Sequence, residues 1–228
     1  MPANMRTLWK EAATALLVRK GHFKQGIELL LLQRSSASKF MPGIRVFPGG
    51  KVSSADFSND WSQLLREHCK GSADDFGLHA VNQSTRDRPD MIRKSQFECS
   101  LISTNIGLRL CALREAFEES GILLCKYKTG SKQVNSSSLN EWRDRVHSDA
   151  SQFLPMCEKF DVIPDVWSLY EWTNWLTPTQ MGGGGNRRFD TMFYVAFVDN
   201  FVEAASDDKE VISSEVNVSL DISLSVCL

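Results

Sequence analysis

One amphipathic helix constrains this chain more than any other segment. Across Asn105–Ser120, the apolar residues Leu110, Leu113 and Phe117 recur at i, i+3 and i+7, so they share one face of a helix. Gly121 follows directly and can adopt the left-handed conformation that ends many helices. The sequence therefore predicts a capped helix whose apolar face packs against the rest of the molecule.

Two apolar runs that precede this helix are typical of β-strands. They cover Ala12–Arg19 and Ile27–Arg34, and the glycines between them indicate a hairpin. A third strand is predicted at Ile44–Phe47. It leads into Pro48-Gly49-Gly50, which we expect to form an active-site loop, because glycine permits dihedral angles and close approaches that side chains forbid. A late strand is predicted at Arg188–Val198.

Polar sequence separates the third strand from the helix. We interpret residues 57–103 as a segment inserted within a single domain that spans residues 1–228, with a helical hint at Trp61–Cys69. Trp172 and Trp175 have helix-like spacing, which favours packing in the core or against the inserted segment over stacking on an adenine ring. Residues 212–228 show no long apolar helix, so we expect an atypical tail that is truncated or disordered.

The charge balance excludes several classes of partner. The 26 Lys and Arg residues nearly cancel the 28 Asp and Glu residues, so no global positive field recruits nucleic acid. The longest aliphatic stretch, Leu29–Leu32, is far shorter than the roughly 20 apolar residues of a membrane-spanning helix.

The cysteines form no CxxC pair and the histidines have no metal-ligand spacing, which argues against a zinc site and favours ordinary roles for both. We expect a monomer in a reducing intracellular compartment, with no nucleic-acid or membrane partner.

Three glutamates on the helix are candidates for metal binding. Glu115, Glu118 and Glu119 lie at i, i+3 and i+4, so their carboxylates share one patch and repel each other. Hard divalent cations prefer carboxylate oxygens and would relieve this repulsion. A solvated acidic face is the alternative interpretation of three such glutamates taken alone.

The residues around these glutamates resemble the Nudix box. The run REAFEESGI from Arg114 to Ile122 matches the second half of the box, written REUxEExGU. The first half, G-x5-E, is similar to the run from Gly50 to Asp56, with aspartate in place of glutamate. Residues 57–113 split the two halves, and the resemblance implies an α/β (α+β) fold, a Nudix-type α/β/α sandwich with a mixed sheet. Arg114 would orient a carboxylate, and Asp56 would lie beside the metal ligands or cap a turn.

The sequence just upstream resembles the coenzyme A diphosphatase signature LLTxRSx3Rx3Gx3FPGG. The run LLLQRSSASKFMPGIRVFPGG keeps its register, with leucine for threonine and Lys39 for arginine. Together with WTNWLTP and RRFDT downstream, it is similar to the peroxisomal acyl-coenzyme A diphosphatase branch of the Nudix hydrolases. This resemblance implies a small-molecule substrate, CoA or acyl-CoA, bound by Arg34, Lys39, Gly49 and Gly50. A surface strand end is the alternative role for Arg34 and Lys39.

The resemblance also implies a reaction. Mg²⁺ or Mn²⁺ bound by Glu115, Glu118 and Glu119 would activate water for attack on a diphosphate, with Glu118 and Glu119 as the catalytic pair and the general base unassigned. We leave Arg187, Arg188 and Asp190 outside the site, because basic residues beside a glycine run are more often a solvated turn. The alternatives are a Nudix hydrolase of ADP-ribose or NADH and a truncated, non-catalytic binding form.

The two ends of the sequence bear on cellular location. The branch is peroxisomal, but Val226-Cys227-Leu228 departs from the small-basic-Leu form of a peroxisomal address, so we expect no C-terminal targeting to that organelle. The stretch Met1–Lys10 is basic, but it is too short and too poor in serine to argue for a mitochondrial presequence. The cytoplasm and the mitochondrion remain open alternatives.

Overall fold

The first two strands of the computed structural model form the predicted hairpin. β1 (Lys10–Lys20) and β2 (Ile27–Arg34) pair antiparallel, with Val18 opposite Leu29. The structure describes residues 9–21, 26–36, 42–68, 76, 78, 101–128, 136–178, 188–199 and 211–216, with the backbone alone for 136, 137 and 211–216.

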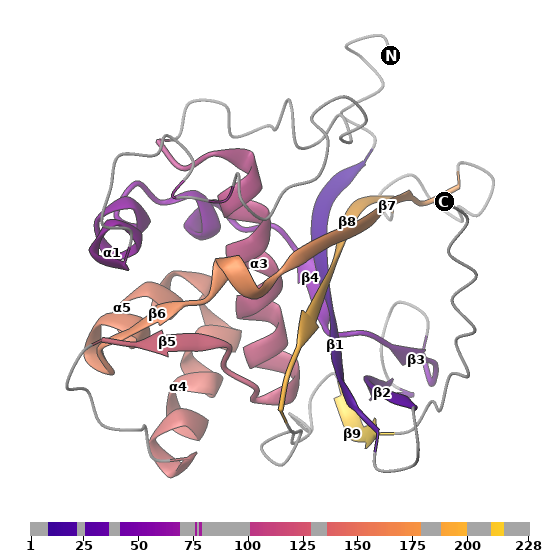
Figure 1. The fold of residues 1–228 in the computed structure, drawn as a ribbon. Coiled ribbons are helices and arrows are strands. Elements are labelled where there is room, and N and C mark those ends of the chain that lie inside the picture. The colour runs from indigo at the N-terminus through magenta and orange to yellow at the C-terminus, as the bar shows by residue number, and fades with distance from the viewer. Residues whose placement is uncertain are drawn as a thin grey trace, which may run out of the picture.

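A mixed sheet is built around β1 (Figure 1). β8 (Phe189–Phe197) runs parallel to β1 along nearly its whole length, and β7 (Tyr170–Leu176) pairs antiparallel with β8. On the other side, β3 (Arg45–Val46) and β9 (Val211–Val216) both pair antiparallel with β2. The order β3-β2-β1-β8-β7, with one parallel pair at its centre, confirms the predicted mixed sheet.

The glycine segment after β3 differs from its prediction. Gly49–Lys51 forms a short strand, β4, that pairs antiparallel with β1, so the expected loop is wrong at these residues. Among the described glycines only Gly43 and Gly121 have positive φ, so dihedral freedom does not explain Gly49 or Gly50. Close approach does, because a Cβ on Gly49 would lie 2.7 Å from the Ala13 carbonyl oxygen.

The predicted helix is the core of the molecule. α3 (Thr104–Ser120) begins after the N-cap Ser103 and ends at Gly121, whose φ of 77° is left-handed as expected. All its residues except Thr104 and Glu115 are buried. One side of α3 packs on β1, β4 and β8, and the described helices lie on that same side of the sheet (Figure 1).

The remaining elements form a layer over the other side of α3. They are η2 (Ser54–Phe57), α1 (Trp61–His68), β5 (Cys125–Tyr127), α4 (Ser136–Ser148), η4 (Ala150–Gln152), α5 (Phe153–Lys159), β6 (Val162–Pro164) and η5 (Val166–Ser168). β5 and β6 pair antiparallel in a separate two-stranded sheet. A helix enclosed by two layers must be buried on all sides, which explains why α3 is apolar beyond one face.

Two segments that were set apart in the sequence contribute to this fold. Within 57–103, Trp61, Leu65, Phe76 and Leu78 are buried in the main core, so described parts of the inserted segment help to form it. The tail begins with strand β9, which the sequence did not predict, and residues 217–228 lie outside the described residues.

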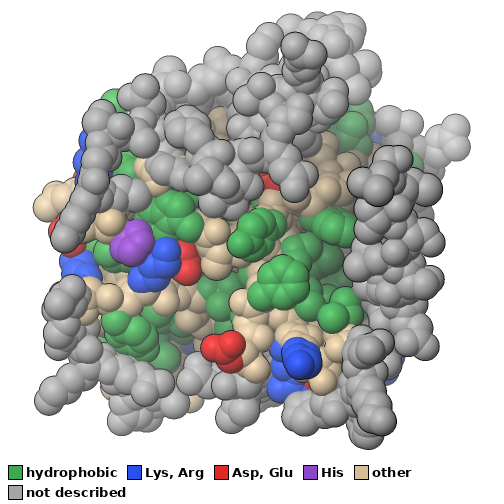
Figure 2. Space-filling model, viewed as in Figure 1, with side chains coloured by type: hydrophobic (Ala, Val, Ile, Leu, Met, Phe, Trp, Pro, Cys, Tyr) green, Lys and Arg blue, Asp and Glu red, His purple; other side chains and the backbone are tan. Residues whose placement is uncertain are grey.

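The expectation of a helical, core position for two tryptophans was wrong. Trp172 and Trp175 lie on the strand β7, not on a helix, and are 69% and 66% exposed. Figure 2 shows apolar side chains gathered over β7 and β8, where Trp175 contacts Phe193 and Tyr170 contacts Phe197. These tryptophans therefore cover the surface of the sheet and contribute nothing to the core.

Within the described part of the chain, no helix is both long and apolar enough to cross a membrane.

Candidate functional site

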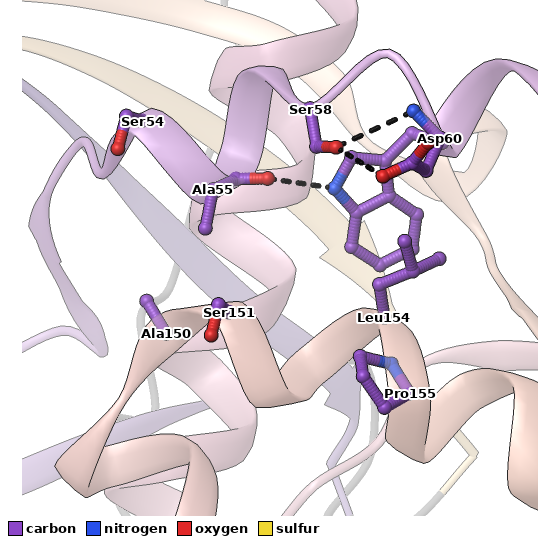
Figure 3. A pocket seen from close by; sticks show the side chains of 9 residues that line it. Ser54, Ala55, Ser58, Asp60, Ala150, Ser151, Leu154 and Pro155 are labelled. Atoms are coloured by element: carbon purple, nitrogen blue, oxygen red, sulfur yellow. Dashed lines mark hydrogen bonds between the residues drawn. The ribbon is translucent and has the colours of Figure 1, made fainter.

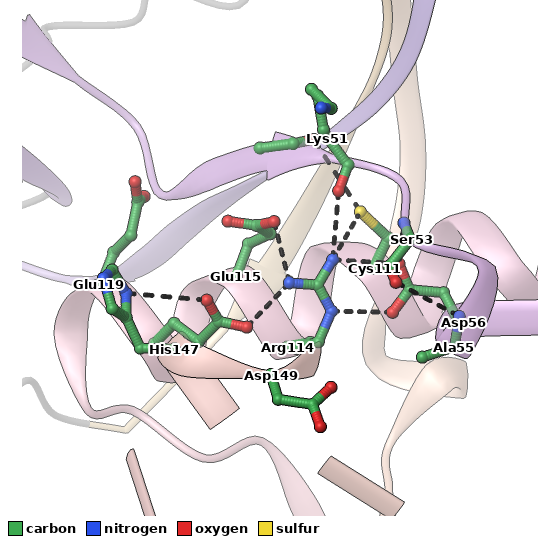
Figure 4. Close-up of polar contacts among 12 residues, drawn as sticks. Lys51, Ser53, Ala55, Asp56, Cys111, Arg114, Glu115, Glu119, His147 and Asp149 are labelled. Atoms are coloured by element: carbon green, nitrogen blue, oxygen red, sulfur yellow. Dashed lines mark hydrogen bonds and ion pairs between the residues drawn. The ribbon is translucent and has the colours of Figure 1, made fainter. Parts of the chain in front are cut away.

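The three glutamates lie in the C-terminal half of α3, where the helix faces β4 (Figure 4). The side chain of Glu115 is partly buried, at 14% exposed, and those of Glu118 and Glu119 are buried. The alternative of a solvated acidic face is therefore wrong. Buried carboxylates cost free energy unless they are paired or bind a cation, so their partners decide what this site can do.

Arg114 is the centre of a buried ion-pair network. Its guanidinium donates two hydrogen bonds to Asp56, from Nε to Oδ1 at 2.7 Å and from Nη2 to Oδ2 at 2.9 Å. Nη1 also donates to Glu115 Oε1 at 2.9 Å and to Glu118 Oε1 at 2.7 Å. Although burial alone would lower it, the neighbouring carboxylates raise the pKa of Arg114 above its usual value, so the guanidinium stays charged.

Asp56 caps a turn, which is one of the two roles that the sequence left open, and it also pairs with Arg114. Its Oδ2 accepts a hydrogen bond from the Ser53 N–H at 2.8 Å, which completes a capping box at the start of η2. The same carboxylate holds Arg114, 58 residues away in sequence. The Asp56 side chain, which is shorter than the glutamate of the box, thus links the turn after β4 to α3. Arg114 connects Asp56 to Glu115 and Glu118.

The carboxyl group of Glu115 is perturbed by its surroundings. Burial, together with the negative Glu118 nearby, raises the pKa of its carboxyl to about 7, although Arg114 lowers it. Arg114 therefore offsets only part of the cost of ionising Glu115 at this position. Additional positive charge at this position would stabilise the ionised form.

β4 approaches the helix closely enough to fix two of the glutamates. The Gly49 N–H donates to Glu119 Oε2 at 2.8 Å. At Gly50, an added Cβ would lie 2.4 Å from Glu115 Oε2. A side chain at Gly50 would therefore displace the Glu115 carboxylate, whereas Gly49 contributes its N–H to Glu119.

The chemistry of these side chains fits a hard divalent cation. Cys111 lies beside the network, and burial raises the pKa of its thiol well above the usual value, so it is not a thiolate that would favour a soft metal. The remaining donors are carboxylate oxygens, which Mg²⁺ and Mn²⁺ prefer. Among the described residues, no three His, Cys, Asp or Glu side chains converge on one point, because Arg114 holds Glu115 and Glu118. Binding of an ion would therefore require at least one of these side chains to turn toward the others.

The other predicted substrate residues lie elsewhere or outside the described residues. Arg34 is the last residue of β2 and is partly buried. Its main-chain N–H donates to the Ile44 carbonyl at 2.9 Å. Lys39 and Arg187 lie outside the described residues. Asp190, which was left outside the site, accepts a hydrogen bond from Asn174 at 2.7 Å on β8. The structure thus brings together the glycines, Asp56, Arg114 and the glutamates.

Sequence reasoning missed two residues of α4 that contact Glu118. Arg143 Nε donates to the Glu118 carbonyl at 2.7 Å, and His147 Nδ1 lies 3.8 Å from Glu118 Oε2. The sequence assigned His147 an ordinary surface or core role, since no histidine had metal-ligand spacing. The i, i+4 spacing of a basic and an imidazole side chain on one helix was the available signal.

A separate cavity of about 450 Å³ lies between η2 and α5 (Figure 3). Ser54, Ser58, Asp60 and Ser151 contribute polar side chains, and Leu154 and Pro155 form part of the apolar wall. None of its lining residues is Arg or Lys, so the cavity offers no cationic side chain to a phosphate. The α3 network is therefore the better candidate for phosphate chemistry.

A comparison with protein families agrees with this geometry. The sequence profile described as the NUDT19 Nudix domain matches residues 9–224. The chain belongs to this family. Its Nudix domain carries the family's box in two pieces, which Asp56 and Arg114 join in space.

Three similar relatives bear the name acyl-coenzyme A diphosphatase NUDT19. The protein of Xenopus laevis is 36% identical and aligns with 92% of this chain and 62% of its own length. That of Gallus gallus is 38% identical, over 90% of this chain and 60% of its own. The human protein is 37% identical, over 82% and 52%. The Nudix domain described here thus spans about half to three-fifths of these relatives.

A solved structure supports the fold. The Nudix hydrolase of Alicyclobacillus acidocaldarius superposes with a TM-score of 0.64 at 19% identity, over 91% of this chain and 78% of that one. At this identity the likeness is informative about the fold alone, and it agrees with the predicted α/β class.

Proposed function

We propose that this Nudix domain hydrolyses the diphosphate of CoA or acyl-CoA and releases 3′,5′-ADP and (acyl-)4′-phosphopantetheine. The observation that carries the proposal is the likeness, at 36–38% identity, to three proteins named acyl-coenzyme A diphosphatase. The buried carboxylate network at the end of α3 supports it, because hydrolysis of a diphosphate requires a site for cationic charge beside the phosphoryl oxygens.

We propose Glu115, Glu118 and Glu119 as the residues that would hold Mg²⁺ or Mn²⁺. Such an ion, when bound, polarises phosphoryl oxygens and lowers the pKa of the water that attacks phosphorus. Glu118 and Glu119 are the proposed catalytic pair. The raised pKa of Glu115 supports this assignment, since a carboxyl that resists ionisation alone gains from a nearby cation.

The other residues of the network would position these ligands. Asp56 would hold the Arg114 guanidinium against Glu115 and Glu118, which keeps these two carboxylates at the site. The Gly49 N–H would do the same for Glu119. We propose that Arg34 and Lys39 contact substrate phosphate, and we assign no general base.

A substrate panel tests the proposal. The chain is incubated with Mg²⁺ and CoA, acetyl-CoA, dephospho-CoA, ADP-ribose or NADH, and the products are separated by chromatography, with Glu119→Gln as the matched control. We expect 3′,5′-ADP from CoA, and slower turnover of dephospho-CoA if Arg34 or Lys39 binds the 3′-phosphate. A preference for ADP-ribose or NADH would assign a different substrate. No Mg²⁺-dependent product from any compound would favour a non-catalytic binding form.

Cellular location is a separate part of the proposal. The resemblance to the acyl-coenzyme A diphosphatase branch favours the peroxisome over the cytoplasm and the mitochondrion. Imaging a chain tagged at its N-terminus decides between them.

A further inference from the structure

Helix α4 contacts one proposed metal ligand at two points. Arg143 donates from Nε to the main-chain carbonyl of Glu118 at 2.7 Å, and His147 Nδ1 lies 3.8 Å from its carboxylate oxygen Oε2. Arg143 and His147 are four residues apart, so they project from the same face of α4. Both contacts come from outside the two halves of the Nudix box.

The contact of Arg143 fixes the position of α4 along α3. Glu118 lies in the last turn of α3, where carbonyl groups lack intrahelical partners and carry the negative end of the helix dipole. A buried guanidinium satisfies such a carbonyl and is favoured there by its charge. The buried side chains of Trp142 and Val146 anchor α4 in the core on either side of this contact. The imidazole is thus carried on a rigid element.

The contact of His147 completes the surroundings of the Glu118 carboxylate. Arg114 Nη1 holds Oε1 at 2.7 Å, and His147 faces Oε2 (Figure 4). One carboxylate oxygen therefore faces a nitrogen from α3 and the other faces a nitrogen from α4, and these two contacts limit rotation of the carboxylate. The His147 side chain is 26% exposed, so it reaches the carboxylate from the solvent side of the site.

We propose that His147 is a positioning residue that orients Glu118 for a divalent cation. The proposal rests on the proposed function in one respect, because it takes Glu118 to be a metal ligand. Groups that orient ligating side chains commonly contribute 10- to 100-fold in metal affinity. Removing the imidazole should weaken binding of the cation by about this factor, through Glu118 and without contact between His147 and substrate.

Binding of Mn²⁺ alone tests this role without substrate. The intensity of the electron paramagnetic resonance signal of free Mn²⁺ gives the Kd for the wild type, His147→Leu and His147→Asn. Asparagine places an amide N–H close to the position of Nδ1. Arg145→Gln is the matched control, because Arg145 lies on the same helix but is exposed and pairs with Glu141 at 2.5 Å.

The expected result is a Kd that is about 10- to 100-fold weaker in His147→Leu, largely restored in His147→Asn and unchanged in Arg145→Gln. An unchanged Kd in His147→Leu would overturn the proposal, as would a wild type that binds no Mn²⁺. CoA turnover in the same samples is a separate readout. A wild type that binds Mn²⁺ but leaves CoA intact contradicts the proposed function, while the Kd comparison still decides the role of His147.

Discussion

The buried pair of Asp56 and Arg114 gives the sharpest prediction for stability. The side chains are 2% and 4% exposed and share two hydrogen bonds at 2.7 and 2.9 Å. Asp56→Asn keeps the shape but removes the negative charge, so it leaves the guanidinium partly uncompensated. Breaking a buried pair in this way typically costs about 3–5 kcal/mol. For a chain of this size each kcal/mol lowers Tm by roughly 2–4 °C, so we expect a fall of about 6–20 °C.

Urea unfolding of the metal-free protein measures this cost. Asp60→Asn is the matched control, because Asp60 is exposed and accepts one hydrogen bond from Ser58 at 2.9 Å. It should change the free energy of unfolding by no more than about 0.5 kcal/mol. If Asp56→Asn is destabilised no more than this control, the network does not hold η2 on α3 as described.

Three further predictions follow from the same site. Glu118→Gln and Glu119→Gln should each lower kcat by orders of magnitude with a smaller effect on KM, because metal ligation acts mainly on the transition state; near wild-type turnover in both would show that the ligands are wrong. Gly50→Ala should also lower kcat, since its Cβ would lie 2.4 Å from Glu115 Oε2, and unchanged kinetics would contradict this approach. In EDTA the free energy of unfolding should fall as pH rises from about 4.5 to about 7, because folded Glu115 binds its proton more tightly than the unfolded chain does; Glu115→Gln should reduce this slope, and an equal slope would contradict the raised pKa.

Local sequence patterns predicted the elements of the fold well. The spacing of Leu110, Leu113 and Phe117 and the glycine at 121 defined α3 to within one residue. The hairpin of β1 and β2 and the strand β8 followed from apolar runs bounded by turn residues. Each of these features depends on interactions between residues that are close in sequence, so the sequence expresses them directly.

Long-range packing decided what the sequence did not predict. Trp172 and Trp175 share a spacing that fits a helix, but pairing of β7 with β8 placed them on a strand. The sequence predicted a loop at Gly49 and Gly50, but these residues pair with β1 as a strand. In the site, Asp56 meets Arg114 across 58 residues, and His147 reaches Glu118 only because α4 packs on α3. The spacing of residues along the chain does not determine these contacts.

The melting temperature as a function of Mg²⁺ concentration tests the central claim most directly, that Glu115, Glu118 and Glu119 hold a divalent cation. A ligand that binds only the folded state at 100 times its Kd stabilises it by about 2.7 kcal/mol, which for this chain corresponds to a rise in Tm of roughly 5–11 °C. We expect this rise in the wild type and its loss when all three glutamates are replaced by glutamine. A wild-type Tm that does not respond to millimolar Mg²⁺ or Mn²⁺, or an equal rise in the triple variant, would contradict the account.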